Sequence, residues 1–367
     1  MSDLPPIGYA GRPDAVRRAL DGRTLIVSAP SDLRWLTSFG GSLGWAVIGP
    51  DRFVLVTDGR YAERAAADAA AAGISPDIVV GRTRPEIRDH VVAAARGGHV
   101  VADATHLTHA TWLDFATDLE LEPDDRTIRR LRRVKDEGEL ARIARGAEIA
   151  DAALTDVAPQ LAEQPTEADV RDELEHRMRR LGADGPSYDT IVASGPQHAA
   201  RPHHHIGRRT IVDGDTVIID VGALVDGYHS DMTRTFIVGE PDEQQQDVYD
   251  LVLEAQLAGL AAIGAGVDAR TIDATCRGVF DGAGMGEWFI HGTGHGVGLD
   301  IHEDPFASTV STDQLVVGDV VTVEPGLYRD GFGGVRIEDL VAVTDTGCRI
   351  LTHLSKDTPC LPSRPTT

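Results

Sequence analysis

Short apolar runs alternate with helical patterns in the first third of the chain. Stretches near residues 60–72 and 85–96 are rich in alanine or charge and are expected to be helices. Five apolar runs are expected to be strands, at residues 24–27, 45–48, 53–56, 78–80 and 99–101. Strands that alternate with helices predict an α/β domain. The doublet Gly40–Gly41 lacks the residues that a phosphate or dinucleotide loop requires.

Helical periodicity takes over after a more polar stretch near residues 120–135. Apolar side chains recur three and four positions apart over residues 140–161, which predicts one long helix. This stripe covers only about three heptads, so packing against a sheet is favoured over a coiled coil. A second helix is expected to begin at Thr166, where Asp169 gives a near capping box, and to end before Gly182.

The second part of the chain is expected to form an α+β domain. Further helices are predicted near residues 242–263 and 269–281, and they separate two segments with the pattern of β-hairpins. Helices that cover one face of an antiparallel sheet define this class. With 367 residues, of which 42% are hydrophobic, the chain is long enough for two cores, and two or three domains are expected.

The first hairpin segment carries Asp220 and Asp231. An apolar run ends at Asp220, the turn pair Asp226–Gly227 follows, and a second run begins after Asp231. A turn at this place sets the two carboxylates opposite each other or one diagonal step apart. Such neighbours share a face of the sheet and lie roughly 4.5 to 8 Å apart.

The second hairpin segment carries Glu324 and Glu338. Residues 320–324 and 335–341 are apolar strands, and Gly331 lies midway between the two glutamates, inside a glycine-rich turn. These two acids are therefore also expected to face each other.

Four carboxylates in apolar strands need a counter-charge, because buried like charges repel. Two divalent cations would cancel them, and Asp and Glu can bridge metals that lie about 3.5 to 4 Å apart. A dinuclear centre is therefore favoured over a mononuclear one. A solvated or salt-bridged side chain, the usual state of an isolated Asp in a strand, is less favoured for two facing pairs.

Residues 291–303 place His291, His295 and His302 in a glycine-rich loop. The glycines leave the backbone open to the close approach of a ligand. A lone buried histidine is usually a hydrogen-bonded core residue, but three in one such loop indicate a site, and one imidazole is expected to cap a metal.

Composition limits the classes of partner. The formal net charge of −23 argues against nucleic acid or an anionic membrane. The basic run at residues 129–133 adjoins acidic residues and is interpreted as a solvated linker. The three cysteines are too scattered for a disulfide framework or a zinc knuckle. With no signal pattern at its start and no apolar stretch long enough to span a bilayer, the protein is expected in the cytoplasm.

Several sequence blocks closely resemble the proline-specific metallopeptidases, prolidase and aminopeptidase P. The blocks are residues 220–222, 231–235, 291–295, 324–326 and 336–339. The resemblance implies a pita-bread catalytic domain at residues 136–360, a linker at 126–135, and a creatinase-type, ribonuclease H-like α/β domain at 1–125. In that family the N-terminal domain helps to form a homodimer. Residues 34–39 could supply a loop near the substrate or be ordinary core.

The resemblance also implies the metal ligands. Asp220 would bind one metal, Asp231 and Glu338 would bridge both, and His295 and Glu324 would complete the shell of the other. In that family a metal-bridging hydroxide attacks the scissile carbonyl, and the residue that matches Glu324 shuttles its proton. Manganese suits these oxygen and nitrogen ligands, with cobalt and zinc as alternatives.

Four further residues are assigned to catalysis or substrate binding. His302 matches the family residue that contacts the tetrahedral intermediate, and His291 and His203 match substrate-side histidines. Arg336 either orients a ligating carboxylate or meets a charge of the substrate.

The neighbouring His204 and His205 match nothing in the family pattern. A solvated loop or adventitious metal binding is favoured for both.

These features predict a hydrolase that cleaves the bond before proline in short peptides. It would be an Xaa-Pro dipeptidase or an Xaa-Pro aminopeptidase, and the loop at residues 302–305 is more similar to prolidases. One alternative is a metal-dependent hydrolase of another small amide. A catalytically silent binding scaffold is less favoured, because all five ligands are present.

Overall fold

The computed structural model describes residues 4–124, 126–204 and 207–361. They form two compact units, Pro5–Arg132 and the chain from Arg133 onward together with Leu4. Each unit has its own apolar core. None of the described helices is both long enough and apolar enough to cross a bilayer.

The first unit is built on a six-stranded mixed sheet with the strand order β4-β3-β2-β1-β5-β6. The strands are β1 (Thr24–Val27), β2 (Trp45–Gly49), β3 (Arg52–Asp58), β4 (Asp77–Gly81), β5 (Val100–Ala102) and β6 (Leu121–Pro123). The helices are α1 (Arg12–Leu20), α2 (Pro30–Thr37), α3 (Ala62–Ala71), α4 (Arg84–Ala95), α5 (His109–Phe115) and α6 (Thr127–Arg133). All five predicted strands and both predicted helices are present, which confirms the α/β expectation.

Residues 34–39 belong mainly to helix α2 and not to a loop. The side chains of Trp35 and Phe39 are 4% and 1% exposed, and the Phe39 ring packs edge-on against Tyr61. The core interpretation of this segment is therefore the correct one. Helix α2 was missed because eight residues give only about two turns of periodicity.

The interpretation of residues 129–133 as a solvated linker is correct only in part, because the boundary between the two units follows Arg132 and both Arg129 and Arg130 are exposed. The run lies in helix α6, and Arg132 and Arg133 are buried. Arg132 Nη1 donates to Asp32 Oδ1 at 2.6 Å. Arg133, which is the first residue of the second unit after the boundary, donates to both carboxylate oxygens of Asp319 in the same unit, at 2.9 and 2.7 Å. Burial of each guanidinium is tolerated because each has a carboxylate partner.

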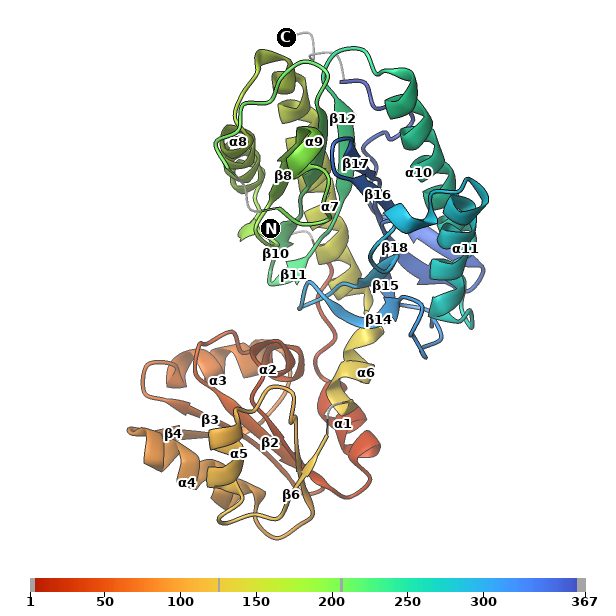
Figure 1. Ribbon diagram of the computed structural model, residues 1–367. Coiled ribbons are helices and arrows are strands. Elements are labelled where there is room, and N and C mark those ends of the chain that lie inside the picture. The colour runs from red at the N-terminus through yellow and green to blue at the C-terminus, as the bar shows by residue number, and fades with distance from the viewer. Residues whose placement is uncertain (1–3, 125, 205–206, 362–367) are drawn as a thin grey trace. The chain divides into compact units, whose positions relative to one another are not determined.

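In the second unit, two pairs of helices cover antiparallel sheets (Figure 1). The helices are α7 (Glu137–Val157), α8 (Glu167–Arg180), α9 (Gly195–His198), α10 (Glu243–Ala261) and α11 (Ala269–Gly282), with short 3-10 helices η1 (Ala158–Glu163) and η2 (Gly286–Trp288). The strands are β7 (Gly185–Pro186), β8 (Ile191–Ser194), β9 (Thr216–Asp220), β10 (Ala223–Val225), β11 (Tyr228–His229), β12 (Thr233–Ile237), β13 (Gly294–Gly296), β14 (Glu303–Ala307), β15 (Val320–Val323), β16 (Gly326–Arg329), β17 (Gly333–Arg336), β18 (Asp339–Thr344) and β19 (Gly347–Ile350).

Apolar side chains fix each helix pair to its sheet. Leu154 of α7 and Leu174 of α8 share a core with Ile219 of β9. Ile272 of α11 shares a second core with Val323 of β15. The α+β prediction for this part of the chain is confirmed, and so are its four long helices.

Capping side chains define where α7 and α8 begin. Asp136 and Glu139 form a capping box at α7, and Thr166 and Asp169 form the predicted one at α8. Gly182 follows α8 with a φ of 105°, a backbone value that L-residues rarely adopt.

The first predicted hairpin is one ladder that closes in a two-residue turn. The turn residues Asp226 and Gly227 have φ values of 49° and 76°, as a type I′ turn requires. The register of β10 and β11 continues into β9 and β12, where Asp220 pairs with Thr233. Asp231 therefore lies one diagonal step from Asp220, the second of the two predicted arrangements.

The second hairpin keeps Glu324 and Glu338 level with each other, as predicted. Val323 pairs with Asp339 in the β15–β18 ladder, and Gly326 pairs with Arg336 in the β16–β17 ladder, in one common register. The two glutamates lie between these ladders.

Each of these glutamates also ties its hairpin to another segment. Glu324 N donates to Thr293 O at 2.8 Å, and Glu338 N donates to Thr233 O at 3.1 Å. Thr235 Oγ1 adds a second link between the hairpins, since it donates to Arg336 O at 2.8 Å. The two carboxylate pairs therefore meet at one junction of the sheets.

Candidate metal centre

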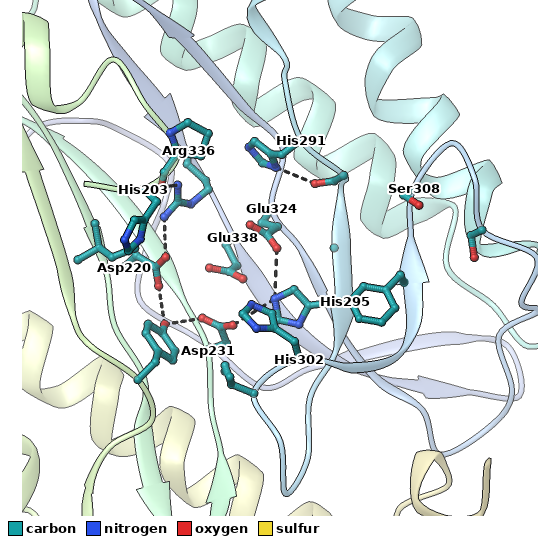
Figure 2. Close-up of a pocket in the computed structure, with 18 of the residues that line it drawn as sticks. His203, Asp220, Asp231, His291, His295, His302, Ser308, Glu324, Arg336 and Glu338 are labelled. Carbon is teal, nitrogen blue, oxygen red and sulfur yellow. Dashed lines mark hydrogen bonds and ion pairs between the residues drawn. The ribbon is translucent and has the colours of Figure 1, made fainter. Parts of the chain in front are cut away.

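All nine residues singled out in the sequence line one cavity of about 840 Å³ in the second unit (Figure 2). They are Asp220, Asp231, His295, Glu324 and Glu338, with His203, His291, His302 and Arg336. Figure 2 shows the four carboxylates and His295 grouped around a common centre. Ligand atoms of Asp231, His295 and Glu338 lie within 4.8 Å of one another.

His295 presents a lone pair to two carboxylates. Its Nδ1 lies 3.0 Å from the carbonyl oxygen of Gly296, so Nδ1 carries the proton that it donates and Nε2 carries none. Nε2 lies 3.6 Å from Asp231 Oδ2 and 3.4 Å from Glu324 Oε1. Burial lowers the pKa of His295 to about 4, which keeps the ring neutral. A lone pair that faces two carboxylates is repulsive unless a cation lies between them, so the donor set fits a metal.

The pKa values of the carboxylates also indicate that a cation belongs at this site. Burial, followed by repulsion from neighbouring carboxylates, raises the pKa of Asp231 and Glu338 well above the ordinary range. Burial raises the pKa of Glu324 to about 7. Divalent cations would remove this penalty, because they favour the ionised form of each ligand.

Tyr188, which the sequence analysis missed, joins the two aspartates. Its hydroxyl oxygen lies 2.5 Å from Asp220 Oδ1 and 2.5 Å from Asp231 Oδ1. The phenol donates its single proton between them and fixes their spacing. Tyr188 lies between β7 and β8, outside any regular pattern, so only the tertiary structure brings it to the site.

Arg336 is held by protein acceptors on all three guanidinium nitrogens. Nη2 donates to Asp220 Oδ2 at 2.6 Å, Nε to Thr233 Oγ1 at 2.9 Å, and Nη1 to Pro202 O at 2.9 Å. Of the two alternatives for Arg336, this geometry supports the one in which it orients a ligating carboxylate.

Glu338 is oriented in a similar way by the first hairpin. Thr233 Oγ1 donates to Glu338 Oε2 at 2.8 Å. Thr233 Oγ1 therefore contacts both Glu338 and Arg336, which are two residues apart in the second hairpin.

The remaining histidines line the same cavity in different settings. The His302 ring packs edge-on against His295, with 4.4 Å between the centroids. His291 Nε2 lies 3.0 Å from the hydroxyl of Tyr328, and burial lowers the pKa of His291 to about 4. His203 is an exposed residue of the cavity wall.

The solvated-loop interpretation of His204 is wrong, because its ring stacks on His198 near the buried Glu167. His205, to which the same expectation applied, lies outside the described residues.

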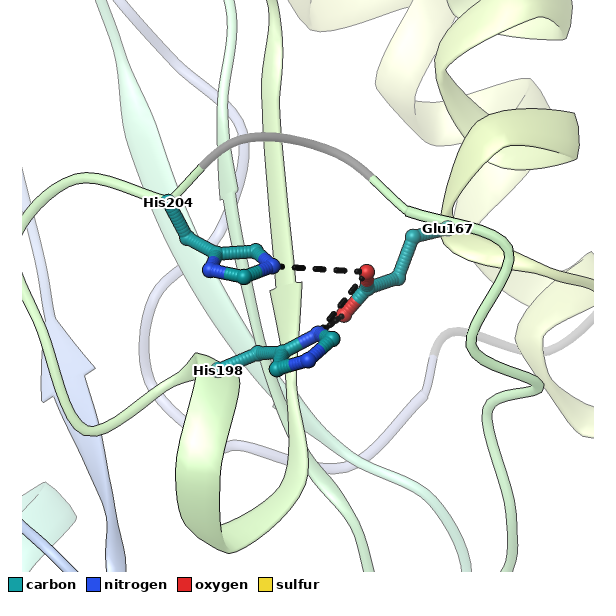
Figure 3. A group of neighbouring side chains, drawn as sticks. All are labelled: Glu167, His198 and His204. Carbon is teal, nitrogen blue, oxygen red and sulfur yellow. Dashed lines mark hydrogen bonds and ion pairs between the residues drawn. The ribbon is translucent and has the colours of Figure 1, made fainter.

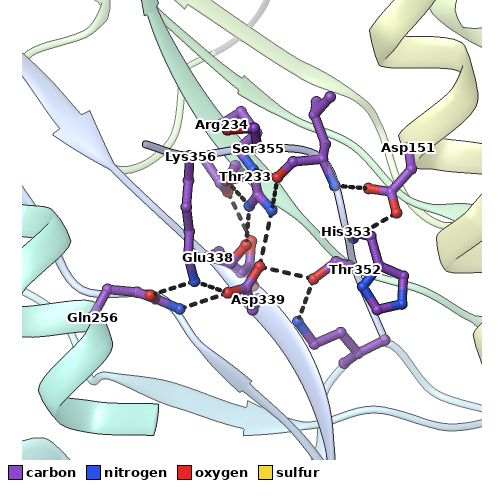
Figure 4. A network of polar contacts seen from close by, with 12 residues as sticks. Asp151, Thr233, Arg234, Gln256, Glu338, Asp339, Thr352, His353, Ser355 and Lys356 are labelled. Atoms are coloured by element: carbon purple, nitrogen blue, oxygen red, sulfur yellow. Dashed lines mark hydrogen bonds and ion pairs between the residues drawn. The ribbon is translucent and has the colours of Figure 1, made fainter. Parts of the chain in front are cut away.

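A buried polar network lies directly behind Glu338 (Figure 4). Arg234 Nη1 donates to Glu338 O at 2.5 Å, and Nη2 donates to Asp339 Oδ1 at 2.9 Å. Asp339 also accepts from Lys356 and from Gln256. Burial alone would raise the pKa of Asp339, but Arg234 and Lys356 hold it below its ordinary value. This network anchors the strand that carries Glu338.

Family models match most of the chain. Residues 141–345 match the model of metallopeptidase family M24, and residues 16–134 match that of the creatinase/prolidase N-terminal domain. An uncharacterised peptidase of Bacillus subtilis is 36% identical over 340 residues, which cover 92% of this chain and 95% of that protein.

Solved structures are similar over both units. An Xaa-Pro dipeptidase from Bacillus anthracis has a TM-score of 0.89 and 35% identity, over 95% of this chain and 99% of its own. An X-Pro aminopeptidase from Thermotoga maritima has a TM-score of 0.86 and 30% identity, over 95% and 99% of the two chains. The chain therefore belongs to metallopeptidase family M24 and has the pita-bread catalytic fold with a creatinase/prolidase-type N-terminal domain.

Proposed function

We propose that this metallopeptidase cleaves the amide bond before proline in short peptides. The observation that carries the proposal is the gathering of four carboxylates in a single cavity, where two of them, Asp231 and Glu324, face the lone pair of His295. The similar structures are described as an Xaa-Pro dipeptidase and an X-Pro aminopeptidase, which supports the substrate class.

Two divalent cations fit the five ligands. Asp220 would hold one cation, Asp231 and Glu338 would bridge both, and His295 and Glu324 would complete the shell of the other. When bound, the cations lower the pKa of water and polarise the scissile carbonyl. Manganese is the proposed metal, because four carboxylates and one imidazole favour a hard or borderline ion, with cobalt and zinc as alternatives.

Side chains of the cavity supply the remaining chemistry. Glu324 takes a proton from the attacking water and returns it to the nitrogen of the leaving proline. His302 stabilises the charge that develops on the carbonyl oxygen, and His291 and His203 hold the peptide. Arg336 keeps Asp220 in position, and the histidines, not Arg336, contact the substrate.

The cavity wall also suits a proline ring. Ile191, Ile301, Phe306 and Val310 contribute apolar surface beside the polar centre. Such surface binds an apolar ring, while the few polar groups set the orientation of the peptide.

A free dipeptide is the preferred substrate in this proposal. The dipeptidase structure has the higher identity of the two compared, 35% against 30%. The loop at residues 302–305 is also more similar to that of prolidases and of the shorter bacterial Xaa-Pro peptidases than to that of the longer aminopeptidase P enzymes. An aminopeptidase would instead accept chains that continue beyond the proline.

Hydrolysis assays with two matched peptides test the activity. Purified protein, supplied in turn with manganese, cobalt or zinc, should hydrolyse Ala-Pro faster than Ala-Pro-Ala and should leave Ala-Ala largely intact. Glu324→Gln serves as the inactive control. A protein that is inert to both proline peptides with every metal would refute the proposed function. Faster cleavage of the tripeptide would assign it to the aminopeptidases.

We also propose a cytoplasmic homodimer. The match of residues 16–134 to the creatinase/prolidase N-terminal domain supports the dimer, since this domain helps to form it in the family. Cys276, Cys348 and Cys360 are all free thiols, which suits a reducing compartment. Light scattering should give twice the mass of the chain, and the mass of one chain would contradict the dimer.

A further inference from the structure

Glu167, His198 and His204 form a second group of potential metal ligands (Figure 3). Glu167 is the first residue of α8, His198 is the last residue of α9, and His204 follows six residues later. None of the three lines the cavity of the carboxylate centre. Their ligand atoms all lie within 4.8 Å of one another.

The distances among these atoms approach those of a metal site. His198 Nδ1 lies 2.9 and 3.0 Å from the two carboxylate oxygens of Glu167. His204 Nε2 lies 4.0 Å from Glu167 Oε2. In a tetrahedral zinc site with bonds of about 2.1 Å, ligand atoms are about 3.4 Å apart. The contacts of Glu167 with the two histidines therefore differ from this spacing by about 0.6 Å or less.

The charges favour a cation that all three side chains share. The Glu167 side chain has no exposed surface, while those of His198 and His204 are 28% and 21% exposed. The two rings stack with 3.8 Å between their centroids. Two protonated imidazoles at this distance repel each other, whereas two neutral imidazoles and one carboxylate can bind a single divalent ion.

Surrounding groups hold Glu167 in a fixed orientation. Ser194 donates to Glu167 Oε1 from its backbone nitrogen at 2.9 Å and from Oγ at 2.7 Å. Arg209 Nη1 donates in turn to Ser194 Oγ at 2.7 Å, and Arg209 is paired with Asp215. Hydrogen bonds of this kind are typical of carboxylates that ligate metals.

We propose that Glu167, His198 and His204 bind one borderline divalent cation such as zinc, independently of the dinuclear centre. Imidazole and carboxylate ligands suit such an ion, and three protein ligands leave a fourth position for water. The partial exposure of both histidines gives the ion a route from solvent.

This ion would clamp the segment that carries His203. Pro202 O accepts from Arg336 Nη1 at 2.9 Å, which ties one end of residues 202–204 to the carboxylate centre. His203 lines the cavity, and the next residue, His204, is a ligand of the proposed site. Metal binding would therefore hold the second end and restrict the backbone on both sides of His203.

Metal counting is the first test. Protein freed of metal is incubated with excess zinc, desalted and analysed by mass spectrometry. We expect the double variant His198→Ala/His204→Ala to hold one zinc per chain fewer than the wild type. His176→Ala, which removes an exposed histidine of α8, should lose none. Equal counts in the wild type and the double variant would overturn the proposal and leave a plain hydrogen-bonded Glu–His pair.

Two further measurements locate the ion and guard against misfolding. Zinc-edge anomalous diffraction should give a peak between Glu167 and the two histidines. A filled carboxylate centre with no such peak refutes the site.

If circular dichroism shows that the double variant does not fold, Glu167→Gln replaces it, because the amide keeps the shape of the side chain. Zinc should slow hydrogen exchange at residues 198–204 in the wild type and not in the variant.

Discussion

Arg336 Nη2 donates to Asp220 Oδ2 at 2.6 Å, between side chains that are only 3% and 15% exposed. The contact makes the arginine a support for a proposed metal ligand. Such supports are commonly worth 10- to 100-fold in metal affinity or activity. Replacement by lysine keeps the charge and removes the planar fork that also contacts Thr233 and Pro202. Arg336→Lys is therefore expected to weaken metal binding roughly 10- to 100-fold in a chelator competition assay. Unchanged metal affinity with a raised KM would instead assign Arg336 to the substrate.

The hydroxyl of Tyr188 is expected to matter for the same reason. Tyr188→Phe removes the proton shared by Asp220 and Asp231 and leaves the aromatic ring. We expect a loss of roughly tenfold or more in metal affinity. Tyr61→Phe, which removes a hydroxyl that hydrogen-bonds with Ser42 in the first unit, is the matched control. Equal metal affinity in both variants would rule out a supporting role for Tyr188.

Asp231→Asn tests the bridging assignment. The amide keeps the size of the side chain and loses the charge that two cations would share. We expect the variant to retain at most one metal per chain and to lose nearly all peptidase activity. The control is Asp189→Asn, which changes an exposed acid in the wall of the same cavity and should leave the metal content intact. Wild-type metal content and turnover in Asp231→Asn would refute the site.

The stability of the metal-free protein should depend on pH through Glu324. Burial raises its pKa from 4.5 to about 7, so the folded state binds this proton more tightly than the unfolded state. The resulting stabilisation is present below about pH 4.5 and is lost as the pH rises through about 7. At 1.36 kcal/mol per pKa unit it amounts to at most about 3 kcal/mol.

The measurement compares wild type with Glu324→Gln in the presence of a chelator. Between about pH 5 and pH 8 the Tm of the wild type should fall relative to that of the variant. Added metal should reverse this trend, because a cation stabilises the ionised carboxylate. Parallel Tm curves in chelator would show that Glu324 does not titrate in this window.

The network behind Glu338 should contribute to stability. Arg234 is 2% exposed and pairs with Asp339, which is 1% exposed. Arg234→Met leaves a buried carboxylate without this partner, and breaking a buried pair typically costs about 3–5 kcal/mol. Arg64→Met, which breaks an exposed pair with Asp68, should cost less than about 1 kcal/mol. Denaturant unfolding measures the free energy of unfolding of both variants. Similar decreases in the two variants would contradict a stabilising role of the buried network.

Local patterns were sufficient to predict each hairpin. The turn at Asp226–Gly227 and the midpoint at Gly331 are encoded within about 20 residues, so the pairing of Asp220 with Asp231 and of Glu324 with Glu338 was accessible from the sequence. The sequence could not show whether Asp220 and Asp231 face each other directly or diagonally, because this depends on the register that places Thr233 opposite Asp220.

Long-range contacts were beyond the reach of these patterns. Thr233 and Glu338 are 105 positions apart in the chain, and nothing in their neighbourhoods indicates that one donates to the other. The same holds for Tyr188, which has no periodic context. The burial of Arg132 and Arg133 was also missed, because a basic run has the same composition whether its carboxylate partners are distant or absent.

The bond from Glu338 N to Thr233 O has a consequence for the order of events during synthesis. A nascent chain that has not reached residue 338 contains Asp220, Asp231 and His295 but lacks the strand that brings the last carboxylate to them. High-affinity metal uptake therefore has to follow the folding of nearly the whole second unit. Ions that bind only this finished state stabilise it by mass action, so the supply of metal would influence how much of the newly made protein survives.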